Sequence, residues 1–125
     1  MEQATGAPDA SYPVKEDIRY LVAVLADNEA IACGGLQTLG PDTAEIKRMY
    51  VVPAHRGRGV SRQILLALED LAGRSGQLIL RVETGTYLPA AIHLYESAGY
   101  RPIPLFGPYV GNSHSVCFEK VLTRL

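Results

Sequence analysis

Two arginines and two glycines stand directly before an apolar, periodic segment of this 125-residue chain. The run is Arg56, Gly57, Arg58 and Gly59, and the periodic segment begins at Val60. Glycine has no Cβ, so its backbone can approach a ligand closely, and the first N–H groups of a helix carry partial positive charge. Guanidinium groups add charge-assisted hydrogen bonds to phosphate oxygens. The junction is therefore a candidate site for a phosphorylated ligand.

The arrangement differs from two common nucleotide-binding motifs. No Lys-Ser or Lys-Thr pair follows the glycines, as a P-loop requires, and Arg62 stands where a GxGxxG motif has its third glycine. Spacing alone therefore leaves two alternatives open, a bound phosphate group and a solvated basic turn.

Periodicity and turn residues divide the chain into strand-like and helix-like segments. The strand-like segments are residues 19–27, 29–40, 43–52, 77–84 and 115–122. Apolar residues recur at helical spacing in residues 60–72 and 89–98, and a strand stub and a Pro- and Gly-rich loop follow the second helix. The predicted order is β-β-β-α-β-α-β-β. We expect an irregular arm, residues 1–18, and one α/β (α+β) domain, residues 19–125.

The third strand is predicted to present two distinct faces. Its residues alternate between two sets, which are Ala44, Ile46, Arg48 and Tyr50 on one side and Glu45, Lys47, Met49 and Val51 on the other.

Composition restricts the classes of partner. Twelve basic and 13 acidic residues give a net charge of −1, so the overall charge of the chain does not attract nucleic acid or an anionic membrane. No apolar run approaches the about 18 residues of a membrane span, and the N-terminus lacks a signal-peptide pattern. Cys33 and Cys117 have apolar neighbours typical of buried, reduced thiols, and the histidines lack metal-ligand spacing. We expect a cytoplasmic protein without a metal site.

Two motifs at matching separation carry a resemblance to a known family. The segment RGRGVS after the strand EIKRMYVVP, together with the later segment AIHLYESAGY, resembles the GNAT superfamily of acyl-CoA-dependent N-acetyltransferases over residues 19–125. The resemblance implies a mixed, mostly antiparallel sheet with splayed central strands and two flanking helices. It also implies acetyl-CoA as co-substrate, with its pyrophosphate on the turn and pantetheine beside the third strand. The implied cofactor-binding residues are Met49, Val51, Arg56, Gly57, Arg58, Gly59, Val60, Ser61 and Arg62.

Acetyl transfer to an amine needs a group that removes a proton and a group that protonates the leaving thiolate. Tyr95 matches the general-acid tyrosine of the family. Glu45 lies at the spacing where one branch of the family carries its general-base glutamate. Glu83 is the competing base, because a carboxylate at the end of a buried strand is costly without a partner. A water relay is the third alternative.

The acceptor end is less defined. Tyr109 and Asn112, in an irregular loop held by prolines, are the candidates for contacting the acceptor. Members of the family usually begin with a strand and two helices that wall the acceptor pocket, and 18 irregular residues are too few to form them. We expect that the acceptor site is open or that a partner subunit closes it, and therefore a homodimer.

These patterns favour an N-acetyltransferase that moves an acetyl group to a primary amine of a small molecule, amino acid or peptide by direct attack in a ternary complex. A catalytically idle acyl-CoA-binding or regulatory module is the alternative. A phosphate-ligand binder unrelated to CoA is disfavoured by the second motif.

Overall fold

The computed structural model describes residues 18–122. The strands are β1 (Ile18–Val24), β2 (Ala30–Thr38), β3 (Thr43–Val51), β4 (Ile79–Gly85), β5 (Arg101–Ile103) and β6 (Ser115–Val121). The helices are α1 (Val60–Arg74) and α2 (Pro89–Ser97), with short 3-10 turns η2 (Pro53–His55) and η3 (Gly107–Tyr109). The predicted order of elements is confirmed. Of the predicted arm, residues 1–17 lie outside the described residues, and Ile18 is already the first residue of β1.

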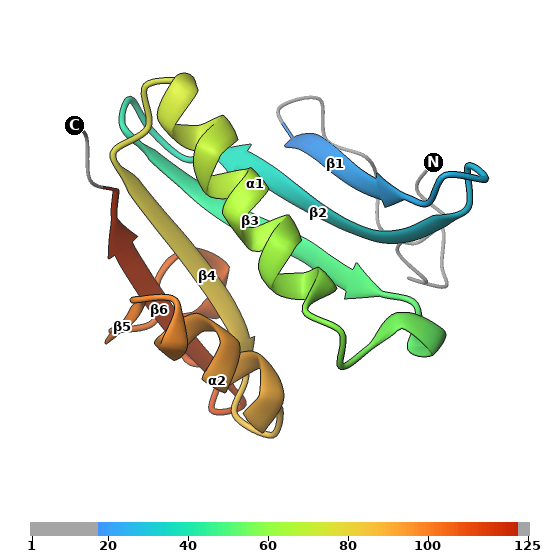
Figure 1. The fold of residues 1–125 in the computed structure, drawn as a ribbon. Coiled ribbons are helices and arrows are strands. Elements are labelled where there is room, and N and C mark those ends of the chain that lie inside the picture. Colours follow the sequence, from blue (N-terminus) through green and yellow to red (C-terminus); the bar gives the residue numbers. More distant parts are fainter. Residues whose placement is uncertain (1–17, 123–125) are drawn as a thin grey trace.

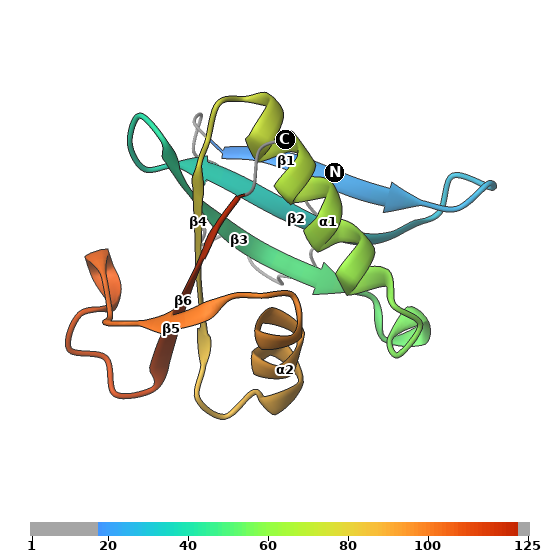
Figure 2. The same ribbon diagram turned by 60° about the vertical axis from the view of Figure 1, so that its left-hand side comes forward.

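The strands form one six-stranded sheet in the order β1-β2-β3-β4-β6-β5. Among the described strands, only β3 and β4 pair in parallel, from Thr43 opposite Ile79 to Ile46 opposite Val82. Beyond that pair the two strands separate, since β3 continues to Val51 without a partner on β4 (Figure 2). The predicted mixed, mostly antiparallel sheet with splayed central strands and two helices is confirmed.

Both helices pack on one face of the sheet (Figure 1). The apolar stripe of α1, with Ile64, Leu65 and Leu68, is buried in the same core cluster as residues of β2, β3, β4 and β6. Tyr95 of α2 joins this cluster and lies 6.4 Å, between ring centroids, from Phe118 of β6. The segment between β5 and β6, which contains η3, passes over the opposite face (Figures 1 and 2).

The predicted alternation along the third strand is correct as far as Lys47 and wrong beyond it. Gly35 of β2 lies opposite Lys47, whereas Cys33 lies opposite Tyr50, so β3 contains one extra residue. This is a β-bulge, and Arg48 adopts a φ of 57° there. Because of the extra residue, Met49 and Val51 pack against the same core as Ala44 and Ile46.

Candidate active site

A groove of about 1140 Å³ opens where β3 and β4 separate. Its lining comes from β3, the junction before α1, the end of β4, α2 and the segment before β6. Among the predicted site residues, those that line it are Glu45, Met49, Val51, Arg56, Gly57, Val60, Ser61, Glu83, Tyr95, Tyr109 and Asn112. The groove thus collects groups from both faces of the sheet.

The arginine–glycine junction forms one end of this groove. Gly57 and Gly59 have φ values of 77° and 79°, in the left-handed region where residues with a Cβ are strained. Apart from the adjoining residues, no heavy atom of residues 18–122 lies within 4 Å of the position that a Cβ would take at either glycine, so the backbone is open to a ligand. Arg56 donates from Nε to the Val51 carbonyl oxygen at 2.7 Å, and its guanidinium lies 5.1 Å from the centroid of the Tyr50 ring. These contacts fold the junction back onto the end of β3.

Three residues of the predicted cofactor set, Arg58, Gly59 and Arg62, are not part of the groove lining. Arg62 instead donates a hydrogen bond to the hydroxyl of Ser97 at the end of α2. Its position in the first turn of α1 places the guanidinium against α2, so the side chain links the two helices.

Tyr95 points from α2 into the groove and has only 4% of its surface exposed. Burial, followed by the charge of Glu83, raises the pKa of Tyr95 to about 12. The phenol is therefore protonated at neutral pH. Among residues 18–122, no hydrogen-bond partner is found for its hydroxyl. The hydroxyl is thus available to a group that enters the groove.

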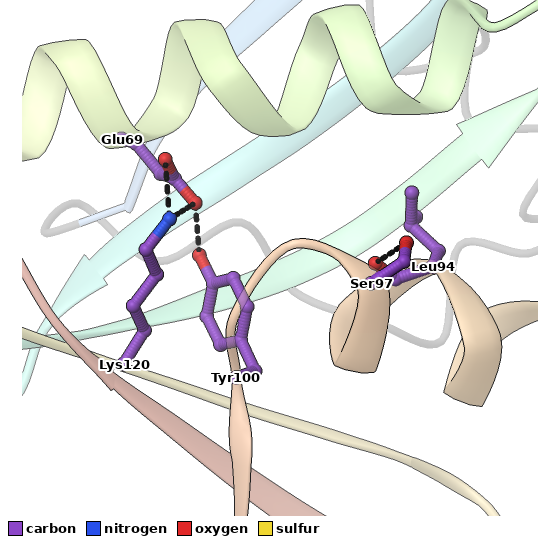
Figure 3. Close-up of polar contacts among 5 residues, drawn as sticks. All are labelled: Glu69, Leu94, Ser97, Tyr100 and Lys120. Carbon is purple, nitrogen blue, oxygen red and sulfur yellow. Dashed lines mark hydrogen bonds and ion pairs between the residues drawn. The ribbon is translucent and has the colours of Figure 1, made fainter.

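A polar cluster at the far end of α2 holds this helix in place (Figure 3). The Tyr100 hydroxyl donates to Oε2 of Glu69 at 2.8 Å, and the ammonium of Lys120 lies 3.2 Å from the same carboxylate. Burial, followed by the charge of Glu69, raises the pKa of Tyr100 well above its usual range. Because Tyr100 follows α2 while Glu69 and Lys120 belong to α1 and β6, the cluster ties α2 to both elements. It thereby fixes where Tyr95 lies.

Glu45 is one of the two candidate bases and is 3% exposed. Its Oε2 accepts a hydrogen bond from the Tyr109 hydroxyl at 2.5 Å, and the ammonium of Lys47 lies 4.0 Å from Oε1. Such partners are what a buried carboxylate requires. Burial, followed by the hydrogen bond to Glu45, raises the pKa of Tyr109 above its usual range. Glu45 lies opposite Arg81, within the part of β3 that still pairs with β4.

Glu83, the second candidate, lies one residue beyond Val82, the last position of β4 that pairs with β3. Its side chain is half-buried, and its Oε2 accepts a hydrogen bond from the Ser115 hydroxyl at 2.6 Å. Glu83 therefore stands at the opening between the strands, whereas Glu45 precedes it. Of the two carboxylates, only Glu83 contributes to the raised pKa of Tyr95.

The predicted acceptor residues lie on the turn before β6, and both line the groove. The side-chain oxygen of Asn112 accepts a hydrogen bond from the backbone N–H of His114 at 2.9 Å, so this oxygen is used within the turn.

Arg81 of β4 makes two long-range contacts. Its guanidinium lies 5.1 Å from the Phe106 ring centroid and donates to Glu119 at 2.9 Å. Sequence patterns gave no signal for these contacts or for Ser115, because each joins residues more than 20 positions apart.

Within residues 18–122, no group of three or more His, Cys, Asp or Glu side chains lies close enough together to hold a metal ion. Neither described helix is both long and apolar enough to cross a membrane. Cys33 and Cys117 are free and buried, as expected.

Comparisons with known proteins point to one family. Residues 2–100 match the model of the acetyltransferase (GNAT) family. The chain is 38% identical over 112 residues to the IAA acetyltransferase of Azospirillum brasilense. The alignment covers 86% of this chain and 71% of that protein. Other curated relatives match over 24% to 64% of their own length.

Solved structures agree on the fold. A Klebsiella pneumoniae structure assigned to the acyl-CoA N-acyltransferases has a TM-score of 0.83 and 33% identity, covering 98% of this chain and 84% of that one. PaiA N-acetyltransferase of Thermoplasma acidophilum, solved in complex with coenzyme A, has a TM-score of 0.73 at 23% identity, covering 85% and 62% of the two chains.

Proposed function

Because the chain belongs to the GNAT family of acetyltransferases, we propose that it transfers an acetyl group from acetyl-CoA to a primary amine by direct attack in a ternary complex. One observation carries the proposal. The glycine junction, the Tyr95 hydroxyl and the Glu83 carboxylate line a single groove at the point where β3 and β4 separate. The acceptor is a small molecule, an amino acid or a peptide.

The residues at the start of α1 fit a pyrophosphate. The open backbone at Gly57 and the N–H groups of the first helical turn supply donors, and Arg56 adds a positive charge beside them. Met49 and Val51 lie on the part of β3 that still pairs with β2 but no longer with β4, and on this open side backbone groups can pair with pantetheine. Acetyl-CoA would supply the activated acetyl group at the opening between the strands.

Glu83 is the better-placed base. The amine nitrogen attacks the thioester carbonyl carbon, the nitrogen loses a proton to Glu83, and the carbon–sulfur bond breaks. Glu83 stands at the opening of the strands and is half-buried, whereas Glu45 is 3% exposed and lies in the part of β3 that pairs with β4. A water molecule that relays the proton is the alternative. Variants at Glu45 and at Glu83 test it, because small and equal losses of activity in both would indicate water.

Tyr95 assists the departure of the sulfur. Its pKa of about 12 exceeds the about 8.5 of a free thiol, so complete proton transfer in water would be unfavourable. The Tyr95 hydroxyl therefore acts first as a hydrogen-bond donor that stabilises the negative charge developing on sulfur. Burial raises the pKa of a thiol as well, so the difference between the two pKa values becomes smaller and the proton can then move from Tyr95 to the sulfur.

The chain is further proposed to form a homodimer in the cytoplasm. Among the described strands, β1 has a neighbour on one side only, and Val22, Val24 and Leu25 at this edge are 38%, 58% and 37% exposed. A twofold copy would cover these side chains. The two free, buried cysteines suit a reducing compartment.

A panel of amines assayed for CoA release tests the function. We expect turnover with at least one primary amine, and a loss of about 100-fold or more in kcat for Tyr95→Phe with little change in acetyl-CoA affinity. If acetyl-CoA binds and no amine releases CoA, the chain is an acyl-CoA-binding module instead.

A further inference from the structure

Two hydroxyl groups from one turn hold the two carboxylates of the groove. Tyr109, at the start of the turn, donates to Glu45 at 2.5 Å, and Ser115, at its end, donates to Glu83 at 2.6 Å. The two hydroxyls belong to residues six positions apart in sequence, whereas the two carboxylates belong to different strands, β3 and β4. The turn therefore bridges the gap between the strands from the face opposite the helices.

The turn is a closed, hydrogen-bonded unit. The Asn112 backbone N–H donates to the Tyr109 carbonyl oxygen at 3.0 Å, and the Ser115 N–H donates to the Asn112 carbonyl oxygen at 3.1 Å. The Asn112 side chain accepts from the His114 N–H at 2.9 Å. These bonds set the separation between the Tyr109 and Ser115 backbones.

The same turn is also tied to the end of β4. The Thr86 N–H donates to the His114 carbonyl oxygen at 2.9 Å, and Ser115 lies opposite Gly85 in the β4–β6 pairing. Hydrogen bonds thus connect the Glu45 carboxylate to Tyr109, and Tyr109 to Ser115 through Asn112. The Ser115 hydroxyl completes the connection to the Glu83 carboxylate. Only 8% of Ser115 is exposed, so water competes little for its hydroxyl.

We propose that Ser115 is a positioning residue of the reaction, which aims the Glu83 carboxylate at the acceptor amine, and that Tyr109 and Asn112 anchor the turn that carries it. This inference rests on the proposed function, in which Glu83 is the base. It revises the sequence-based expectation for Tyr109 and Asn112, because the Tyr109 hydroxyl and the Asn112 side-chain oxygen are used to build the turn.

The physical reason lies in the opening of the strands. Beyond Val82, the strand β4 has lost its neighbour β3, so no side chain of β3 stands beside Glu83 in the sheet to limit its rotamers. A carboxylate that turns away by about 1 Å loses much of its effectiveness as a base. A short hydrogen bond from a buried hydroxyl restores one orientation of the carboxylate.

Ser115→Ala tests the proposal, and Ser113→Ala is its matched control. Ser113 lies on the same turn, is exposed, and makes no hydrogen bond to any residue of the described part of the chain. We expect Ser115→Ala to lower kcat about 10-fold while KM for acetyl-CoA stays within about twofold. Ser113→Ala should match the parent in both, and Ser115→Thr, which keeps the hydroxyl, should restore kcat.

A pair of tyrosine variants tests the anchor. Tyr109→Phe removes the hydroxyl that holds Glu45 and should lower kcat in the same direction as Ser115→Ala. Tyr87→Phe removes a hydroxyl from a residue that is 71% exposed at the same groove, and it should lower kcat less than Tyr109→Phe does. Thermal unfolding of each variant distinguishes a loss of folding stability from a change in the orientation of the carboxylate.

Carbon-13 NMR of the glutamate side-chain carboxyls keeps the test independent of activity, with the Glu83 resonance assigned through Glu83→Gln. In Ser115→Ala the chemical shift of this resonance should differ from its value in Ser113→Ala, because the carboxylate has lost its hydrogen-bond donor, while that of Glu45 should stay unchanged. Equal chemical shifts of the Glu83 resonance, or a parental kcat in Ser115→Ala, overturn the role of Ser115. A parent enzyme that acetylates no amine overturns the proposed function instead, and the NMR comparison still decides whether Ser115 controls Glu83.

Discussion

Raising the pH from about 9 to about 11 should destabilise the parent chain more than the Tyr95→Phe variant. Burial raises the pKa of Tyr95 from 10.0 to about 12, so unfolding in this window exposes a phenol that then releases its proton. The unfolded state binds fewer protons than the folded state, and stability therefore falls as the pH rises through this window. Below pH 10 both states keep the proton, and the contribution is fully present.

The size of the effect follows from the shift. Two pH units correspond to about 2.7 kcal/mol once the pH exceeds the folded pKa, and about half of this, 1.4 kcal/mol, is lost at pH 11. No discount for solvent screening is needed, because Tyr95 is 4% exposed. Tyr100 and Tyr109 shift in the same direction and are present in both proteins, so their contributions cancel apart from the smallest cause of the Tyr100 shift, which is Tyr95 itself.

Urea unfolding followed by circular dichroism at several pH values measures the difference. The free energy of unfolding of the parent should fall by about 1.4 kcal/mol more than that of Tyr95→Phe between about pH 9 and about pH 11. Parallel curves would refute the burial of an ionisable phenol at this position, and with it the argument that Tyr95 stays protonated as a donor to the sulfur.

Three other predictions address the ligand, the base and the assembly. Gly57→Asp should bind acetyl-CoA at least about 10-fold more weakly than Gly57→Asn in calorimetry, since both side chains tolerate a left-handed backbone and only one repels phosphate. Equal affinities would remove the pyrophosphate from this turn. Glu83→Gln should lower kcat about 100-fold, whereas Glu45→Gln should mainly lower the free energy of unfolding, by about 1–3 kcal/mol, because it disturbs a buried hydrogen bond. The reverse pattern would make Glu45 the base. Light scattering at micromolar concentration should give the mass of a dimer, and an active monomer would contradict the assembly.

The order of the elements was predictable because each has a strong local pattern. Apolar residues at helical spacing identify α1, and the two glycines before it place its start at Val60. The bulge in β3 was not predictable, since an extra residue becomes visible only when the register against β2 is known. Strict alternation therefore put Met49 and Val51 on the wrong face.

The same contrast holds for the candidate site. Tyr95, Glu45 and Glu83 were identified from motifs and strand ends, and the fold brings all three to one groove. Which carboxylate stands at the opening depends on where β3 and β4 stop pairing, and this is a property of the sheet. Ser115 was missed because nothing near it in sequence indicates a contact with Glu83, 32 positions away.

Arg62 shows how a motif position can take a second role. Its place in the glycine motif predicts a contact with phosphate, and this stays a prediction. Its side chain bonds to Ser97 and connects α1 to α2, a contact that depends on the relative position of the two helices.

Mass spectrometry of a single turnover tests the central claim most directly. The parent chain is mixed with acetyl-CoA and the most active amine of the panel, quenched at intervals, and both the amine and the intact protein are weighed. Direct attack in a ternary complex predicts an N-acetylated amine that forms with CoA, and a protein that never carries an acetyl group. An acetylated protein that precedes the product, or bound acetyl-CoA with no acetylated amine at all, would contradict the account.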